Sequence, residues 1–128
     1  MTRPTGKKIL IVDDEAGIRE LLSDFLKPKG YEILTAENGL EALEKAAQFL
    51  PNLIFLDIMM PKMDGWQALA QLRMKEETKD IPVIMLTARS ETEALLRSEH
   101  EHAVDYFIKP VNLEELSIFI KRYIDLRP

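Results

Sequence analysis

The feature that most constrains the fold is a regular alternation between short apolar runs and longer segments with helical periodicity. The apolar runs are rich in branched and aromatic residues, which favours strands. They cover residues 8–12, 31–36, 53–56, 81–87 and 104–110. The connections are short, and no linker or low-complexity segment interrupts the pattern. Such alternation predicts a parallel sheet with helices on both faces, because right-handed crossovers leave few other topologies.

Capping residues indicate where the helices begin. Helices are expected from Glu15 to the breakers Pro28 and Gly30, from Asn38 to Pro51, from Gly65 to about Lys75, over the polar segment 91–100, and from Asn112 to about Leu126. Asn38, Asp64 and Asn112 can each accept a hydrogen bond from a first-turn amide. Glu41 follows Asn38 by three residues, as in a capping box. Glu15 is also expected to act as a helix cap.

Composition excludes several classes of protein. The 128 residues are 46% hydrophobic and 30% charged, as in an ordinary globular domain. The net charge is −5 and the basic residues are scattered, which argues against direct nucleic-acid binding. No apolar run approaches the length of a membrane span, no secretory signal pattern is visible, and cysteine is absent. We therefore expect one cytoplasmic domain over residues 1–128, ordered from about 7 to 126, with no membrane contact and no visible output domain.

Chemically active residues stand where the expected strands end. Asp13 and Asp14 follow the first strand, and Asp57 ends the third, after the buried run "NLIFL". Thr87 ends the fourth strand, and the fifth strand is followed by Lys109 and Pro110. In open α/β sheets, ligands bind at the carboxyl ends of the strands. These residues are therefore predicted to form one site.

The mixture of acids, a hydroxyl and a lysine indicates phosphoryl chemistry. Three carboxylates at one place repel one another unless a cation lies among them, and oxygen ligands in an incomplete cage suit Mg²⁺. Lys109 and Thr87 are suitable partners for phosphoryl oxygens. An ionised Asp57 is already nucleophilic, so no separate base is needed.

Four motifs carry a family resemblance that covers essentially the whole chain. "LIVDDE", "LIFLDIMMPKMDG", "VIMLTA" and "DYFIKP" occur in this order. Together they resemble the response-regulator receiver domain (CheY-like) of bacterial two-component signalling. The resemblance implies a flavodoxin-like, three-layer αβα sandwich with a five-stranded parallel sheet of order 2-1-3-4-5. It also implies a phosphoacceptor domain rather than an enzyme, with Mg²⁺-dependent self-phosphorylation and autodephosphorylation.

The resemblance assigns a phosphorylation set. Asp57 matches the aspartate that takes a phosphoryl group from a sensor histidine kinase or a histidine phosphotransfer domain. Asp14 matches the direct Mg²⁺ ligand, and Asp13 matches its neighbour, which usually acts through a metal-bound water. Asp57 itself and the backbone carbonyl of Met59 complete the metal ligands. Lys109 matches the lysine that pairs with the phosphoryl group, and the Lys109–Pro110 bond matches one that is usually cis.

The resemblance also assigns a switch. Thr87 matches the hydroxyl that moves to bond the phosphoryl group, and Tyr106 matches an aromatic residue that turns inward when the threonine moves. The change is then read on the face formed by the fourth helix, the fifth strand and the fifth helix, by a downstream protein or a missing output domain. Phosphorylation-dependent homodimers are a further expectation. Phe119, Tyr123 and Leu126 form either such a partner face or part of a wide core face.

Two positions are expected to tune the lifetime of the phosphoryl group. Met59 stands two residues after Asp57, and Arg89 stands two residues after Thr87. Neither a thioether nor a cation orients an attacking water well, so we expect slow intrinsic dephosphorylation.

The sequence also departs from the family pattern outside the acidic site. His102 stands where glycine is common, and Val111 stands where phenylalanine is common. His100 and His102, which alternate with glutamates, are interpreted as solvated side chains rather than a metal pair.

Three other functions remain as alternatives. A hydrolase of the haloacid-dehalogenase type also uses a strand-end aspartate and Mg²⁺, but it needs a second aspartate where this chain has Met59. A flavin- or nucleotide-binding module would need a Gly-rich or hydroxyl-rich phosphate loop where this chain has "DDEAG". A degenerate receiver that acts only as an interaction module is disfavoured, because every position of the phosphorylation set is filled.

Overall fold

The computed structural model describes residues 6–88 and 105–125. Several sequence predictions fall on the remaining positions and lie outside the described residues. They concern the polar helix at 91–100, Arg89, His100, His102 and Leu126. Within the described ranges, no helix has both the length and the apolar character needed to cross a membrane.

The core of the molecule is a five-stranded parallel sheet. Its strands are β1 (Lys8–Val12), β2 (Glu32–Ala36), β3 (Leu53–Asp57), β4 (Val83–Ala88) and β5 (Asp105–Lys109). Their order is β2-β1-β3-β4-β5, and every neighbouring pair is parallel. This confirms the predicted flavodoxin-like topology. β4 begins later than predicted, because the amide of Ile81 bonds the carbonyl of Thr78 in the preceding turn and Pro82 has no amide to donate.

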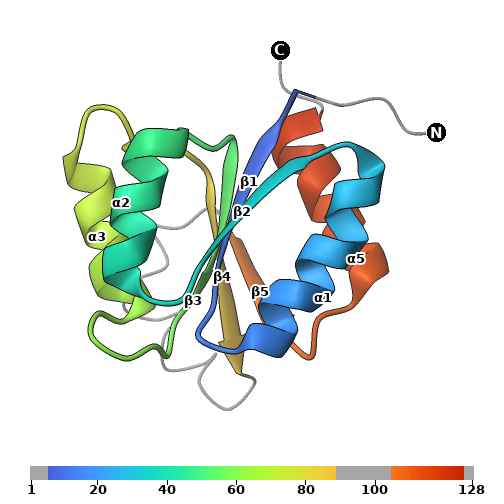
Figure 1. The fold of residues 1–128 in the computed structure, drawn as a ribbon, viewed down its shortest axis with the longest axis horizontal. Coiled ribbons are helices and arrows are strands. Elements are labelled where there is room, and N and C mark those ends of the chain that lie inside the picture. Colours follow the sequence, from blue (N-terminus) through green and yellow to red (C-terminus); the bar gives the residue numbers. More distant parts are fainter. Residues whose placement is uncertain (1–5, 89–104, 126–128) are drawn as a thin grey trace.

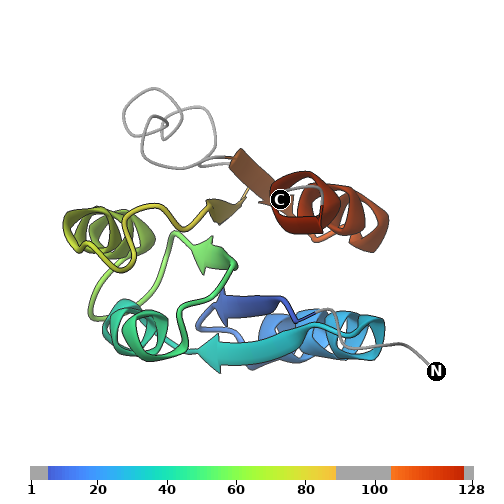
Figure 2. The ribbon, with the colours of Figure 1, turned by 90° about the horizontal axis from the view of Figure 1, so that it is seen from above.

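Four described helices cover the sheet in two layers (Figure 1, Figure 2). The helix α1 (Ala16–Leu26) and the helix α5 (Leu113–Ile120) lie against one face. The helices α2 (Gly39–Phe49) and α3 (Gly65–Met74) lie against the other. A short 3₁₀ turn at Lys27–Lys29 follows α1, and a π-helical turn at Lys121–Asp125 extends α5.

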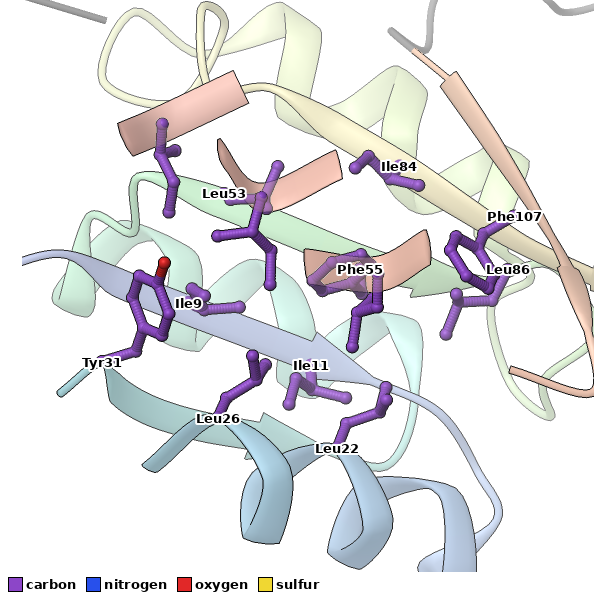
Figure 3. Packing of buried hydrophobic residues seen from close by; sticks show 13 residues of the cluster. Ile9, Ile11, Leu22, Leu26, Tyr31, Leu53, Phe55, Ile84, Leu86 and Phe107 are labelled. Atoms are coloured by element: carbon purple, nitrogen blue, oxygen red, sulfur yellow. The ribbon is translucent and has the colours of Figure 1, made fainter. Parts of the chain in front are cut away.

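Alternation along the strands divides the core into two clusters. Ile9 and Ile11 point toward α1 and α5, whereas Leu10 and Val12 point toward α2 and α3. Figure 3 shows the first cluster, in which Phe55 occupies the middle of the sheet. All five residues of β3 are buried, so the strand that ends in Asp57 is packed on both faces.

The core packing also bears on the two roles that the sequence left open for the aromatic residues of the last helix. Phe119 and Tyr123 both pack against the cluster beneath α1 and α5, and the hydroxyl of Tyr123 donates to Asp105 Oδ2 at 2.7 Å. These two partly buried residues therefore contribute to a wide core face, and a partner role for their exposed parts stays a prediction. The large apolar side chain that α5 exposes is Ile118.

Three of the four predicted caps are confirmed. Asn38 and Asn112 each accept a hydrogen bond from the amide three residues on, and Asp64 forms a reciprocal capping box with Gln67. The prediction for Glu15 was wrong, since its side chain makes no capping hydrogen bond. Asp13 instead accepts from the Glu15 amide at 2.9 Å, so the preceding acid fixes the turn into α1.

Gly65, the first residue of α3, sits directly on the backbone of Asp57. Its amide donates to the carbonyl of Ile58 at 2.8 Å, which closes the loop 58–64 upon itself. A Cβ at this position would lie 2.3 Å from the Asp57 carbonyl oxygen. The approach therefore requires a residue without a side chain.

Replacing Gly65 by alanine tests this close approach. Gly65→Ala is expected to lower the free energy of unfolding by roughly 1–3 kcal/mol, because α3 must move away from β3. Gly17→Ala is the matched control: Gly17 lies in α1 with nothing near its would-be Cβ, so the change is expected to raise stability by about 0.5–1 kcal/mol. Urea unfolding measures both. Equal effects of the two substitutions would contradict the close approach.

Candidate functional site

The site is built at the edge where β1, β3 and β5 end. Asp57 is the last residue of β3, and Asp13 follows the last residue of β1. Because Val12 pairs with Leu56 across these two neighbouring strands, the two aspartates lie side by side. The sequence prediction that the first and third strands are neighbours is thereby confirmed, and it is what brings the acids together.

The three aspartates form a compact group of oxygen ligands. Each offers a carboxylate oxygen, and these oxygens lie within 4.8 Å of one another. Asp13 is completely buried and Asp57 is 4% exposed, whereas Asp14 faces solvent. The group is thus open on one side only. An all-oxygen set of this kind suits a divalent cation that keeps part of its water shell.

Lys109 reaches this group from the end of β5. Its ammonium nitrogen Nζ lies 3.0 Å from Asp13 Oδ2, 3.4 Å from Asp57 Oδ1 and 3.5 Å from Glu15 Oε1. The Lys109–Pro110 peptide bond is cis, as the family resemblance implies. One lysine therefore faces both buried carboxylates and a third acid at the rim of the site.

Burial governs the electrostatics of the two inner carboxyl groups. Desolvation raises the pKa of Asp57 to about 7, and the negative charge of Asp13 raises it further, while the charge and hydrogen bond of Lys109 act to lower it. Burial also raises the pKa of Asp13. For Lys109, burial acts to lower the pKa, but the hydrogen bond and charge of Asp13 and the charges of Asp57 and Glu15 together raise it. The pocket therefore holds more negative charge than one lysine satisfies, and the residues present fit a bound cation.

Two further predicted residues lie on β4 and β5. Thr87 on β4 is 1% exposed, and its hydroxyl donates to the carbonyl of Ala88 at 3.2 Å. Tyr106 on β5 is half-buried and packs with the cluster beneath α2 and α3. Its ring centroid lies 6.2 Å from that of Trp66, at the start of α3.

The loop after Asp57 holds the first proposed tuning position. Met59 stands two residues after Asp57, and its side chain is 62% exposed. Pro61 accepts a hydrogen bond from the Met63 amide, and Lys62 between them adopts φ of 71°. The second tuning position, Arg89, lies outside the described residues.

Sequence reasoning missed two residues of this region. Glu15 was interpreted as a cap, although its place next to two strand-end aspartates could have signalled a contact with the site. Trp66 carried no signal at all, because its contact with Tyr106 joins two segments that no local pattern connects.

Comparisons with known proteins agree with this geometry. The family model for the response regulator receiver domain matches residues 9–121. Sporulation initiation phosphotransferase F of Bacillus subtilis is 37% identical over 122 residues, which cover 95% of this chain and 97% of that protein. Regulatory protein AtoC of Escherichia coli is 41% identical over 94% of this chain, which spans only 26% of that longer protein.

A solved structure gives the same result in three dimensions. The response regulator TrrA of Thermotoga maritima, solved in complex with Mg²⁺ and beryllofluoride, is 42% identical. It aligns with a TM-score of 0.82, covering 92% of this chain and 99% of its own. Family model, relatives and fold agree, and the chain therefore belongs to the response regulator receiver domain family of two-component systems.

Proposed function

We propose that this protein is a signalling switch that accepts a phosphoryl group on Asp57 from a sensor histidine kinase or a histidine phosphotransfer domain. The observation that carries the proposal is the nearly buried carboxylate of Asp57 at a strand end, 3.4 Å from Lys109 and grouped with two other aspartates. A carboxylate that is nearly buried at a strand end does not stabilise the fold, since burying its charge costs several kcal/mol.

Asp13, Asp14, Asp57 and the backbone carbonyl of Met59 are the groups that would hold Mg²⁺. The carboxylate oxygens within 4.8 Å of one another support this ligand set. When bound, the ion supplies positive charge that offsets the charge developing on phosphoryl oxygens. Asp57 is held at the end of β3 and Asp13 directly after β1, while Asp14 faces solvent and would complete the set of carboxylates around the ion.

The transfer itself requires one nucleophile and one cation from the chain. An oxygen of Asp57 forms a bond to phosphorus while the phosphorus–nitrogen bond of the donor phosphohistidine breaks and its imidazole nitrogen keeps the electron pair. Lys109 pairs with the incoming phosphoryl oxygens, because it already lies within reach of Asp57. The Thr87 hydroxyl then leaves the Ala88 carbonyl and donates to the phosphoryl group.

The added negative charge would bias a two-state element made by Thr87 and Tyr106. We infer that the change at Thr87 and Tyr106 alters the surface that includes β5 and α5. This surface would then bind a downstream protein, an attached output domain, or a second copy in a phosphorylation-dependent homodimer. Ile108 and Ile118 expose apolar surface there. Residues 1–128 would act as one cytoplasmic receiver unit, either alone or as part of a longer protein.

Phosphorylation of Asp57 is tested with acetyl phosphate and Mg²⁺. The wild-type protein is expected to gain the mass of one phosphoryl group in an acid-stable, alkali-labile adduct, as intact-protein mass spectrometry would detect. Asp57→Asn is expected to lose the adduct because a neutral amide replaces the nucleophilic carboxylate. Asp64→Asn is the matched control, since Asp64 only caps α3 and asparagine caps equally well. An adduct that persists in Asp57→Asn would defeat the central proposal.

The electrostatics predict an unusual pH dependence in metal-free buffer. Because the pKa of Asp57 rises from 3.8 to about 7 on folding, the folded protein holds a proton that the unfolded chain has released. Stability therefore falls as pH rises from about 4 through 7. At pH 8, Asp57→Asn is expected to raise the free energy of unfolding by roughly 1–3 kcal/mol, because it removes a buried charge.

Urea unfolding with EDTA measures this effect, and Asp64→Asn is the control because it removes a carboxylate from the cap of α3 and none from the buried site. Adding Mg²⁺ at pH 8 should stabilise the wild type by mass action and should stabilise Asp57→Asn much less. Stability that rises through this pH window in the wild type, beyond that of Asp57→Asn, would contradict the elevated pKa.

Met59 is predicted to lengthen the lifetime of phosphorylated Asp57. Met59→Asn is expected to shorten the phosphoryl half-life several-fold, because an amide can orient an attacking water and a thioether cannot. Met74→Asn is the control, since Met74 is also exposed but lies at the far end of α3. Loss of the adduct over time measures the rate. An unchanged or longer half-life in Met59→Asn would refute this role.

A further inference from the structure

Trp66 is the single tryptophan of the chain and makes an aromatic contact that joins α3 to β5. Its ring lies tilted by 56° against Tyr106, with a centroid separation of 6.2 Å. This distance is within the range in which aromatic rings attract one another. Both residues also pack against the core cluster beneath α2 and α3. The side chain of Tyr106 is therefore held by the first turn of a helix that comes forty residues earlier in the chain.

The first turn of α3 also lies directly against the backbone of Asp57 and Ile58. The amide of Gly65 bonds the Ile58 carbonyl at 2.8 Å, and a Cβ on Gly65 would lie 2.3 Å from the Asp57 carbonyl oxygen. The capping box between Asp64 and Gln67 fixes the same turn from its outer side. A shift of the backbone at Ile58 is therefore expected to move the start of α3, which is hydrogen-bonded to Ile58 and leaves no room for a side chain next to Asp57.

We propose that Trp66 is a positioning residue for Tyr106, and that the first turn of α3 transmits the state of Asp57 to β5 by a route separate from Thr87. The route runs from the Asp57 backbone to Gly65, then through Trp66 to the ring of Tyr106. It rests on the proposed function, in which Asp57 is the phosphoacceptor. Both ends of the route are packed rather than mobile contacts, which is what a transmitted displacement requires.

The opposite face of β5 provides a natural control. Phe107, the next residue of the strand, contacts Phe119 of α5 edge to face, with ring centroids 5.0 Å apart. This pair resembles the Trp66–Tyr106 pair in kind, but it lies in the cluster beneath α1 and α5. It has no backbone contact with Asp57 comparable to that of Gly65. Phe119→Leu therefore removes an aromatic contact to β5 without touching the proposed route.

Fluorine NMR tests the inference in the intact chain. The protein is labelled with 3-fluorotyrosine, which places one fluorine on each of the three tyrosines, and the Tyr106 resonance is assigned from a Tyr106→Phe sample. Mg²⁺ and beryllofluoride are then added as a mimic of the phosphoryl group. Beryllofluoride bound at Asp57 gives its own fluorine resonance, so one spectrum reports both occupancy of the site and the response of Tyr106.

In the wild type, beryllofluoride is expected to displace the Tyr106 resonance. In Trp66→Leu the displacement is expected to fall below half of the wild-type value while the bound-beryllofluoride resonance persists. Trp66→Phe keeps an aromatic ring and should retain most of the displacement, and Phe119→Leu should retain all of it. Thr87→Ala should leave a residual displacement that is lost when Trp66→Leu is added.

Other outcomes overturn the inference in distinguishable ways. A full displacement in Trp66→Leu with the site occupied would refute a role for Trp66. Equal losses in Trp66→Leu and Phe119→Leu would assign the effect to general packing of β5 and would refute the separate route. If Trp66→Leu does not fold, Trp66→Met takes its place with the same expected result. Absence of a bound-beryllofluoride resonance in the wild type would defeat the proposed function, and the inference with it.

Discussion

The rest of the structure depends on one unfavourable interaction, the close approach of two buried carboxylates at the ends of β1 and β3. Asp13 and Asp57 are both withdrawn from water and share one lysine. Their mutual repulsion is imposed by the strand order, because neighbouring parallel strands deliver their last residues to the same edge. The two apolar clusters on either side of the sheet supply the packing that holds this arrangement in place. Positive charge would therefore stabilise the site, and the proposed phosphoryl transfer would take place in a pocket whose carboxylates already favour a cation.

Much of the fold was predictable because its signals are local. Continuous apolar runs identified the buried strands, and Asn38, Asp64 and Asn112 marked helix starts by a rule that involves only three residues of separation. The order of the strands came from a family resemblance and not from the runs themselves, since β-strand patterns do not state which strand pairs with which. The approach of Asp13, Asp57 and Lys109 could then be predicted, because all three stand at strand ends.

The errors and omissions have a common physical origin. Glu15 occupies the position of a cap, but Asp13 already accepts from its amide, and its own carboxylate turns toward Lys109 instead. The contact of Trp66 with Tyr106 depends on how α3 is placed over the sheet, which no spacing encodes. In both cases the local sequence pattern correctly places the residue at the start of a helix, but the partner of its side chain depends on tertiary structure. Local patterns therefore locate the acidic centre of the site well and its surrounding contacts poorly.

The loop 58–64 combines a backbone held by a hydrogen bond with a side chain, that of Met59, that is free to vary. The hydrogen bond from the Gly65 amide to the Ile58 carbonyl closes this loop and holds the start of α3 next to Asp57. The side chain of Met59 points outward from this closed frame and is mostly exposed. Substitution there changes the chemistry beside the acceptor and leaves the frame intact. If Met59 has the proposed tuning role, the lifetime of the phosphoryl group on Asp57 could change through this one exposed residue without a change in the fold.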